Sequence, residues 1–222
     1  MRMSTDRPGA RWWVPDDVST GGLRAGIEAC QGCELYRDAT HGVPGRGPQD
    51  ASLMLVGEQP GDDEDRAGEP FVGPAGQLLD RALADAGVPP EAVFVTNVVK
   101  HFRWSGTRGK RRIHQSPSRV HVAACGPWLV AELSMVRPRG IVLLGGTAGK
   151  AVFGTAFRVG ESRGRMADWP DDFPGATDAT PAPDWVLPTL HPAAVLRSRK
   201  RDADYGTLVD DLTLARSELD TR

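Results

Sequence analysis

Four short apolar runs are spaced along the chain, and longer amphipathic stretches lie between them. Each run is rich in Val, Ile and Leu and is followed by a turn signal, as in strands buried on both faces of a parallel sheet. Pro188 in the last run favours an edge strand, because proline cannot donate a hydrogen bond to a neighbouring strand. The four runs cover residues 52–56 (SLMLV), 92–95 (AVFV), 140–144 (GIVLL) and 185–190 (WVLPTL).

Apolar residues at helical spacing predict helices over residues 75–86, 118–136 and 202–218. Pro74 suits the first turn of the first helix. Pro127 lies inside the second helix and is expected to kink or split it. Residues 160–184 predict a long polar loop with room for a short hairpin. The alternation of strands and helices predicts an α/β fold, a three-layer α/β/α sandwich with a central, mainly parallel four-stranded sheet.

The composition is that of a globular protein. The 222 residues are 40% hydrophobic, and 27 Lys and Arg against 29 Asp and Glu give a formal net charge of −2. We expect an N-terminal extension over residues 1–21 and a single domain over 22–222. No apolar run reaches the roughly 18–20 residues that span a bilayer, and the N-terminus lacks the apolar segment of a signal peptide. These features predict a cytoplasmic protein that does not associate with membranes. We also expect it to be a monomer.

Polar residues and glycines follow the predicted strands. Gly57-Glu58-Gln59-Pro60-Gly61 follows the first strand, Asn97 the second, Gly145-Gly146-Thr147 the third and His191-Pro192 the fourth. In open α/β sheets, ligands bind just past the carboxyl ends of the strands. These residue types suit a small planar ligand, so the sequence predicts a binding site at this edge.

The cysteines indicate metal or redox chemistry. The chain has three, an odd number that argues against a disulfide framework. Cys30 and Cys33 have the C-x-x-C spacing of a metal or redox pair, although two ordinary thiols would have the same spacing. Cys125 lies far away in a helical pattern, where a buried structural cysteine is usual. A tetrahedral metal site needs a fourth ligand. Sequence spacing does not choose among the histidines, which are His41, His101, His114, His121 and His191.

A basic segment over residues 102–119 contains no acidic residue and has Phe102 and Trp104 among its cations. Basic and aromatic residues together are typical of phosphate and nucleic-acid binding, although a solvated basic loop would have the same composition. The cations are Arg103, Arg108, Lys110, Arg111, Arg112 and Arg119, and His114 ends the KRRIH run.

Taken together, these motifs resemble the uracil-DNA glycosylase superfamily in its iron–sulfur branch. GEQPG (57–61), PFVGPAG (70–76), TNVVK (96–100), ACGPWL (124–129), VLLGGTA (142–148) and HPAAVLR (191–197) follow one another in the family's order. The similarity runs from about Cys30 to the C-terminal helix. Gln59 and the inserted KRRIH loop (110–114) resemble the UdgX subgroup, since related enzymes have Ala at position 59.

The resemblance implies an enzyme that excises uracil from DNA, with single-stranded DNA preferred. It also implies that His114 attacks the sugar and leaves the protein covalently bound to the DNA. Related enzymes carry a cysteine cluster ligand where this chain has His101. The resemblance therefore implies a [4Fe–4S] cluster with the ligands Cys30, Cys33, Cys125 and His101.

The resemblance also assigns roles to the residues at the strand ends. Phe71 would stack on uracil, and the carboxamide of Asn97 would bind its O4 and N3–H. His191 would donate a hydrogen bond to the uracil O2 as negative charge develops there. Glu58 would either stabilise the cationic sugar or orient the nucleophile, and Gln59 would help to position this chemistry.

The resemblance implies further residues that contact the substrate. Arg197 would fill the gap left by the flipped base or hold a phosphate. The other predicted substrate-binding residues are Gly57, Lys110, Arg111 and Arg112.

Three alternative functions remain open. The first is an ordinary turnover glycosylase in which His114 only contacts DNA. The others are a non-catalytic protein that binds uracil-containing DNA, and an iron–sulfur electron carrier.

Overall fold

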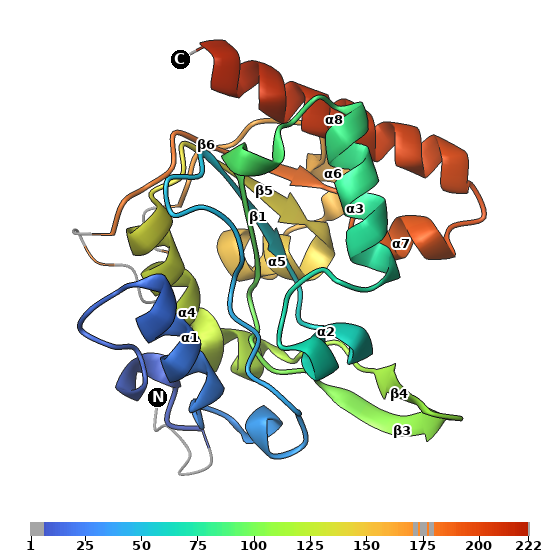
Figure 1. Cartoon of the computed structure of the whole chain (residues 1–222). Helices are drawn as coiled ribbons and strands as arrows, with labels where there is room; N and C mark the ends of the chain where they lie inside the picture. Colours follow the sequence, from blue (N-terminus) through green and yellow to red (C-terminus); the bar gives the residue numbers. More distant parts are fainter. Residues whose placement is uncertain (1–6, 171–172, 174–176, 178–179, 222) are drawn as a thin grey trace.

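A parallel sheet of four strands forms the centre of the protein (Figure 1). This computed structural model describes residues 7–170, 173, 177 and 180–221. The strands lie in the order β2-β1-β5-β6, and each is buried along its whole length, so the predicted parallel sheet is confirmed. Their bounds are β1 Leu53–Gly57, β2 Val93–Asn97, β5 Gly140–Leu144 and β6 Trp185–Thr189.

Pro188 lies in β6, which is an edge strand, as its sequence position predicted. It stands opposite Leu143 of β5 in the parallel register. An edge position tolerates proline because one side of the strand needs no hydrogen-bond donor for the sheet.

Helices cover both faces of the sheet and complete the predicted three-layer sandwich (Figure 1). Successive residues of a strand point to opposite faces. Leu53 and Leu55 of β1 accordingly pack with the helices α3 and α8, whereas Met54 and Val56 pack with α1 and α4. The bounds of these helices are α1 Thr20–Glu28, α3 Pro74–Asp85, α4 Arg119–Val136 and α8 Arg201–Thr221.

Helix α4 runs without interruption through Pro127, so the expected split of this helix does not occur. Cys125, Trp128 and Leu129 are buried on either side of the proline and pack in the core. This packing keeps both halves of the helix in the core despite the hydrogen bond that proline cannot donate.

A β-hairpin lies in the basic segment, over residues 104–114. Strands β3 (Trp104–Arg108) and β4 (Arg111–His114) pair antiparallel and form a separate two-stranded sheet (Figure 1). Among the described residues of the 160–184 stretch, α6 ends at Ser162, and Ala167 pairs with Val186 in a single bridge. Part of this stretch lies outside the described residues.

The remaining helices are short and connect the larger elements. Ala10, in the expected N-terminal extension, is buried against the core, and its 3₁₀ helix contacts α4. Within the described part of the chain, no helix combines the length and apolar character needed to cross a membrane. The short helices are η1 Ala10–Trp12, η2 Glu34–Arg37, α2 Asp62–Ala67, η3 Pro90–Ala92, α5 Gly145–Phe153, α6 Val159–Ser162 and α7 Pro192–Arg197.

Candidate active site

Gly57, Asn97 and Phe71 meet where β1 and β2 end. A Cβ atom on Gly57 would lie 2.4 Å from Asn97 Oδ1 and 2.8 Å from Phe71 Cζ. Only glycine therefore lets the carboxamide and the aromatic ring approach each other here. Asn97 is 3% exposed and Phe71 is 7% exposed, so both groups are fixed at the edge of the core.

The loop that carries Phe71 has an unusual backbone. Phe71 has a φ of 56°, in the left-handed region that few side chains adopt. Gly76 supports this turn, because a Cβ there would lie 1.7 Å from the carbonyl oxygen of Phe71. The PFVGPAG motif thus orients one aromatic ring toward Gly57.

A carboxylate and an imidazole face each other beside this pair. Glu58 Oε1 is buried and has no hydrogen-bond partner among the described residues, and it lies 3.4 Å from His114 Nε2. The other oxygen, Oε2, accepts a hydrogen bond from the hydroxyl of Thr147. Burial lowers the pKa of His114 below its ordinary value, although the charge of Glu58 opposes this shift. This shift favours the uncharged imidazole at pH 7, and the His114 side chain is 48% exposed.

His191 follows β6 and caps the N-terminus of α7. Its Nδ1 accepts a hydrogen bond from the Ala193 N–H at 3.1 Å. Burial lowers its pKa to about 4, so the ring is neutral, and the proton resides on Nε2 because Nδ1 is an acceptor. Gly145 makes room for this ring, since a Cβ there would lie 2.8 Å from His191 Cβ.

Arg197, at the last turn of α7, is an exposed cation near the two histidines. Its charge contributes to the lowered pKa of His114 and of His191, after the larger effect of burial. An exposed guanidinium in this position suits a phosphate or another anion.

Gln59 joins the base of the hairpin to the end of β1. Its Nε2 donates to the carbonyl oxygens of Arg103 and Gln115, both at 3.1 Å, and its Oε1 accepts from the Arg103 N–H at 3.1 Å. One side chain therefore holds the chain on both sides of the hairpin that carries His114.

The three cations of the KRRIH run have different surroundings. Lys110 lies in the hairpin turn and is exposed, and Arg111 is exposed but contacts Asp63 at 3.2 Å. Arg112 is largely buried and is paired with Asp62 and Asp65. DNA binding by Lys110 and Arg111 stays a prediction, and DNA binding by Arg112 would require a phosphate to displace its two acidic partners.

The three cysteines are free and buried around the start of α4 and the end of α1. Cys33 and Cys30 influence the pKa of Cys125 electrostatically, so the three thiols lie near one another. Backbone N–H groups of Gly32 and Lys100 donate to Cys30 Sγ at 3.4 Å and Cys125 Sγ at 3.3 Å, and the indole of Trp128 donates to Cys30 at 3.3 Å. Burial raises the pKa of all three thiols, that of Cys33 to about 11.

His101 is 4% exposed and lines a cavity of about 130 Å³ together with Cys30. Burial lowers its pKa to about 4, which leaves the neutral imidazole that metals bind. His121, in contrast, bonds to Glu34 at 3.0 Å, and His41 bonds to Glu28 at 3.0 Å.

Within the described residues, no three His, Cys, Asp or Glu side chains are grouped closely enough to hold a single metal ion. A [4Fe–4S] cluster is larger, and its ligands bind different irons. Buried thiols that accept N–H hydrogen bonds, with a neutral histidine on the same cavity as Cys30, are a donor set that fits such a cluster.

Two residues that contact the predicted site residues were given no role of their own by the sequence. Thr147 donates to Glu58, and Lys100 donates through Nζ to the carbonyl oxygen of Asn97 at 2.8 Å. Thr147 does stand at a predicted strand end, which was a usable signal. Lys100 is fully buried, and its contacts become visible only in the folded chain.

Comparison with known proteins identifies the family. The model of the uracil DNA glycosylase superfamily matches residues 44–213. The chain therefore belongs to the uracil DNA glycosylase superfamily.

Individual relatives in this superfamily have more specific names. The Type-4 uracil-DNA glycosylase of Pyrobaculum aerophilum is 38% identical over 174 residues, which cover 77% of this chain and 81% of that protein. The Type-4 uracil-DNA glycosylase of Thermotoga maritima is 33% identical over 192 residues, covering 86% and 90%. That of Archaeoglobus fulgidus is 41% identical over 127 residues, covering 57% and 60%.

Proposed function

We propose that this protein excises uracil from DNA, with single strands preferred, and then remains covalently attached to the abasic sugar through His114. The relatives named Type-4 uracil-DNA glycosylases support the excision step. The observation that carries the covalent step is the position of the His114 imidazole, whose Nε2 lies 3.4 Å from a buried carboxylate oxygen of Glu58 that has no hydrogen-bond partner among the described residues. A neutral imidazole beside a base is an activated nucleophile.

Uracil enters as a flipped or unpaired base, because its reacting bond is inaccessible inside a duplex. The ring of Phe71 provides an apolar face for stacking. The carboxamide of Asn97 accepts from N3–H and donates to O4, a pattern that the edge of uracil matches and the edge of cytosine does not. The close approach of these two groups at Gly57 supports this assignment.

Cleavage of the glycosidic bond sends its electron pair to uracil and leaves positive charge on the sugar. His191 is neutral with its proton on Nε2, so it is able to donate a hydrogen bond to the uracil O2 as that oxygen becomes negative. Glu58, whose buried Oε1 lies 3.4 Å from His114 Nε2, stabilises the cationic sugar.

His114 then forms the new bond. The lone pair of its unprotonated nitrogen binds C1′ of the cationic sugar after the bond from C1′ to uracil has broken, and the imidazole takes up the positive charge. Glu58 balances this charge or accepts the proton of the second ring nitrogen. The departing uracil anion takes a proton from solvent. An imidazole bound to C1′ through nitrogen is a poor leaving group, so the product persists.

We also propose that Cys30, Cys33, Cys125 and His101 hold a [4Fe–4S] cluster. When bound, the cluster would link the 30–33 segment, the segment that follows β2, and α4, and so contribute to structure rather than to bond cleavage. His101 and Cys125 stand on either side of the hairpin in sequence. The four residues therefore fix both ends of the segment that carries His114.

The test is the number of uracils released per protein molecule. Excess uracil-containing single-stranded oligonucleotide is incubated with the protein, and free uracil is counted, with a thymine oligonucleotide as the control. We expect a plateau at one uracil per protein. Continued release would contradict the covalent step and indicate a turnover glycosylase. Absence of release would contradict the excision step as well.

A further inference from the structure

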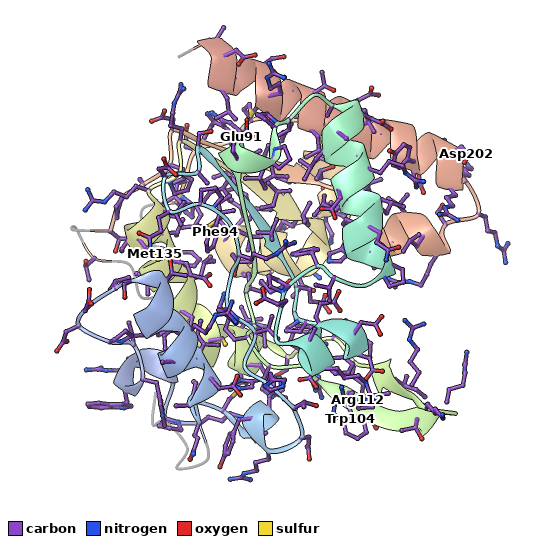
Figure 2. All side chains as sticks on the ribbon, viewed as in Figure 1. Glu91, Phe94, Trp104, Arg112, Met135 and Asp202 are labelled. Atoms are coloured by element: carbon purple, nitrogen blue, oxygen red, sulfur yellow. The ribbon has the colours of Figure 1, made fainter. Side chains whose placement is uncertain are left out.

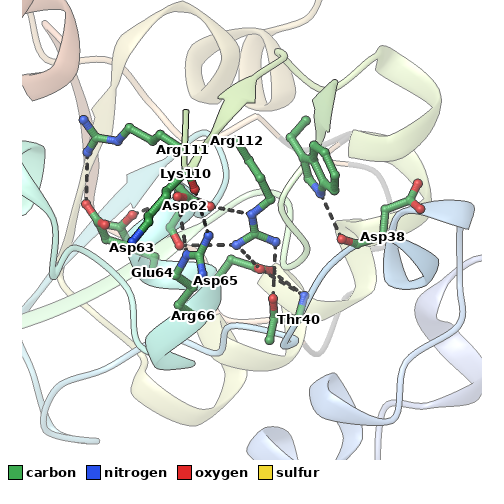
Figure 3. A network of polar contacts seen from close by, with 12 residues as sticks. Asp38, Thr40, Asp62, Asp63, Glu64, Asp65, Arg66, Lys110, Arg111 and Arg112 are labelled. Atoms are coloured by element: carbon green, nitrogen blue, oxygen red, sulfur yellow. Dashed lines mark hydrogen bonds and ion pairs between the residues drawn. The ribbon is translucent and has the colours of Figure 1, made fainter. Parts of the chain in front are cut away.

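Arg112 is engaged by acidic residues of the protein itself. Its guanidinium pairs with Asp62 Oδ1 and, at 2.8 Å, with Asp65 Oδ2, and it donates to Thr40 Oγ1 at 3.2 Å (Figure 3). The side chain is 11% exposed, and those of Asp62 and Asp65 are 8% and 0% exposed. All three charges are therefore largely removed from water.

Aromatic rings enclose the other side of the guanidinium. Arg112 lies over Phe102 at 5.3 Å and over Trp104 at 5.5 Å, measured to the ring centroids. Figure 2 shows Arg112 and Trp104 together beside α2. Such cation–π contacts add to the ion pairs when the cation is desolvated. The indole N–H of Trp104 also donates to the Asp38 carbonyl oxygen at 2.9 Å.

This arrangement determines where His114 lies. Arg112 and His114 are two residues apart on β4, so their side chains point to the same face of the hairpin. On that face, Arg112 contacts α2 and His114 contacts Glu58. Phe102 touches both, since its ring centroid lies 6.0 Å from that of His114.

The neighbouring Arg111 is much more exposed than Arg112. The side chain of Arg111 is 65% exposed and its partner Asp63 is 46% exposed, which is a weak surface pair. A phosphate would have to displace two buried carboxylates before it reached the guanidinium of Arg112. The arginine is thus poorly suited to bind DNA and well suited to hold the hairpin.

We propose that Arg112 is a positioning residue, whose ion pairs with Asp62 and Asp65 clamp the β3–β4 hairpin to α2 so that His114 faces Glu58. The inference rests on the proposed function, because the role of His114 defines what is positioned. The alternative role for Arg112, a phosphate contact, predicts opposite effects for substitutions of its acidic partners.

The experiment compares Arg112→Gln, Arg112→Lys and Asp62→Asn in the full chain. Each is assayed for the rate of covalent attachment and for uracil release with a uracil-containing single-stranded oligonucleotide. We expect all three variants to attach about 10- to 100-fold more slowly, as misplacement of a reacting group by about 1 Å predicts. Uracil release should persist. Lysine should fail because it cannot bridge two carboxylates and stack on two rings.

A phosphate contact would give a different pattern. Asp62→Asn removes negative charge, so it would then leave attachment unchanged or faster, and Arg112→Lys would retain most of the rate. Arg112→Gln alone would weaken DNA binding and reduce its salt dependence by about one phosphate. Either result for Asp62→Asn or Arg112→Lys overturns the proposal. Arg24→Gln, which removes an exposed ion pair with Glu69 at 2.8 Å, is the matched control and should behave as wild type.

Hydrogen exchange separates this proposal from the proposed function. The clamp predicts faster hydrogen exchange of the backbone amides of residues 104–114 in Arg112→Gln and Asp62→Asn. The exchange of amides in the central four-stranded sheet should not change. This readout needs no DNA, so it holds even for a protein that forms no covalent product. Unchanged exchange in both variants would contradict the clamp.

Discussion

The buried ion pair between Lys100 and Glu132 offers a sharp test of the fold beneath the site. Lys100 is 0% exposed and Glu132 is 1% exposed, and Lys100 Nζ lies 2.7 Å from Glu132 Oε2. Nζ also donates to Thr96 Oγ1 at 2.6 Å and to the Asn97 carbonyl oxygen at 2.8 Å. The perturbation is Glu132→Gln, which keeps the shape of the side chain and removes its charge.

The expected magnitude follows from the burial. Removal of one partner from a buried ion pair costs about 3–5 kcal/mol, because the remaining charge is uncompensated. Glutamine can still accept from the Gly45 N–H, as Glu132 Oε1 does at 2.9 Å, but its amide nitrogen then faces the Lys100 ammonium group and cannot accept from it, so we expect a loss of at least about 3 kcal/mol. For a chain of this length, that corresponds to a decrease in Tm of about 6–12 °C.

The assay is the free energy of unfolding in denaturant, measured by circular dichroism on wild type, Glu132→Gln and the double variant Lys100→Met/Glu132→Gln. The second substitution removes the uncompensated ammonium group. We therefore expect the double variant to be more stable than Glu132→Gln alone. A loss below about 1 kcal/mol in the single variant, or a double variant less stable than the single, would refute the reasoning.

Three further predictions concern the site. Gly57→Ala places a methyl group 2.4 Å from Asn97 Oδ1 and should slow uracil release about tenfold or more, whereas Gly21→Ala, with open space around its Cβ, should not; equal rates would contradict the recognition role. The charge of Glu58 raises the pKa of His114, so Glu58→Gln should move the acidic limb of the attachment rate to lower pH, and a shift upward would contradict the pairing. Iron chelation, or Cys125→Ala, should abolish the visible absorbance of the purified protein and lower its Tm. The cluster would be contradicted if the purified wild-type protein were colourless and chelation left its Tm unchanged.

The sheet could be predicted because its strands are buried on both faces. The run 140–144 has no polar residue and is typical of a buried strand in its length and its content of Val, Ile and Leu. The structure places β5 at those residues. The hairpin was missed because its strands are almost wholly polar and exposed. Its position depends on Arg112 and the acids of α2, a contact between residues about 50 positions apart.

The site was predictable only in part. Strand ends indicated Glu58, Asn97 and His191, since the topology of a parallel sheet brings such ends to one edge. Spacing did not separate the histidines, because burial and partners decide their roles. His101 lines the cavity of Cys30, whereas the similarly buried His121 is bonded to Glu34.

The most direct test of the central claim is a denaturing gel of the protein incubated with a uracil-containing single-stranded oligonucleotide. The account predicts a band of protein plus DNA that survives heat and detergent, is absent with thymine, and maps by peptide mass to His114. His114→Ala should lose this band. Abasic DNA cleaved only after alkali, with no such band from the wild-type protein, would contradict covalent capture by His114.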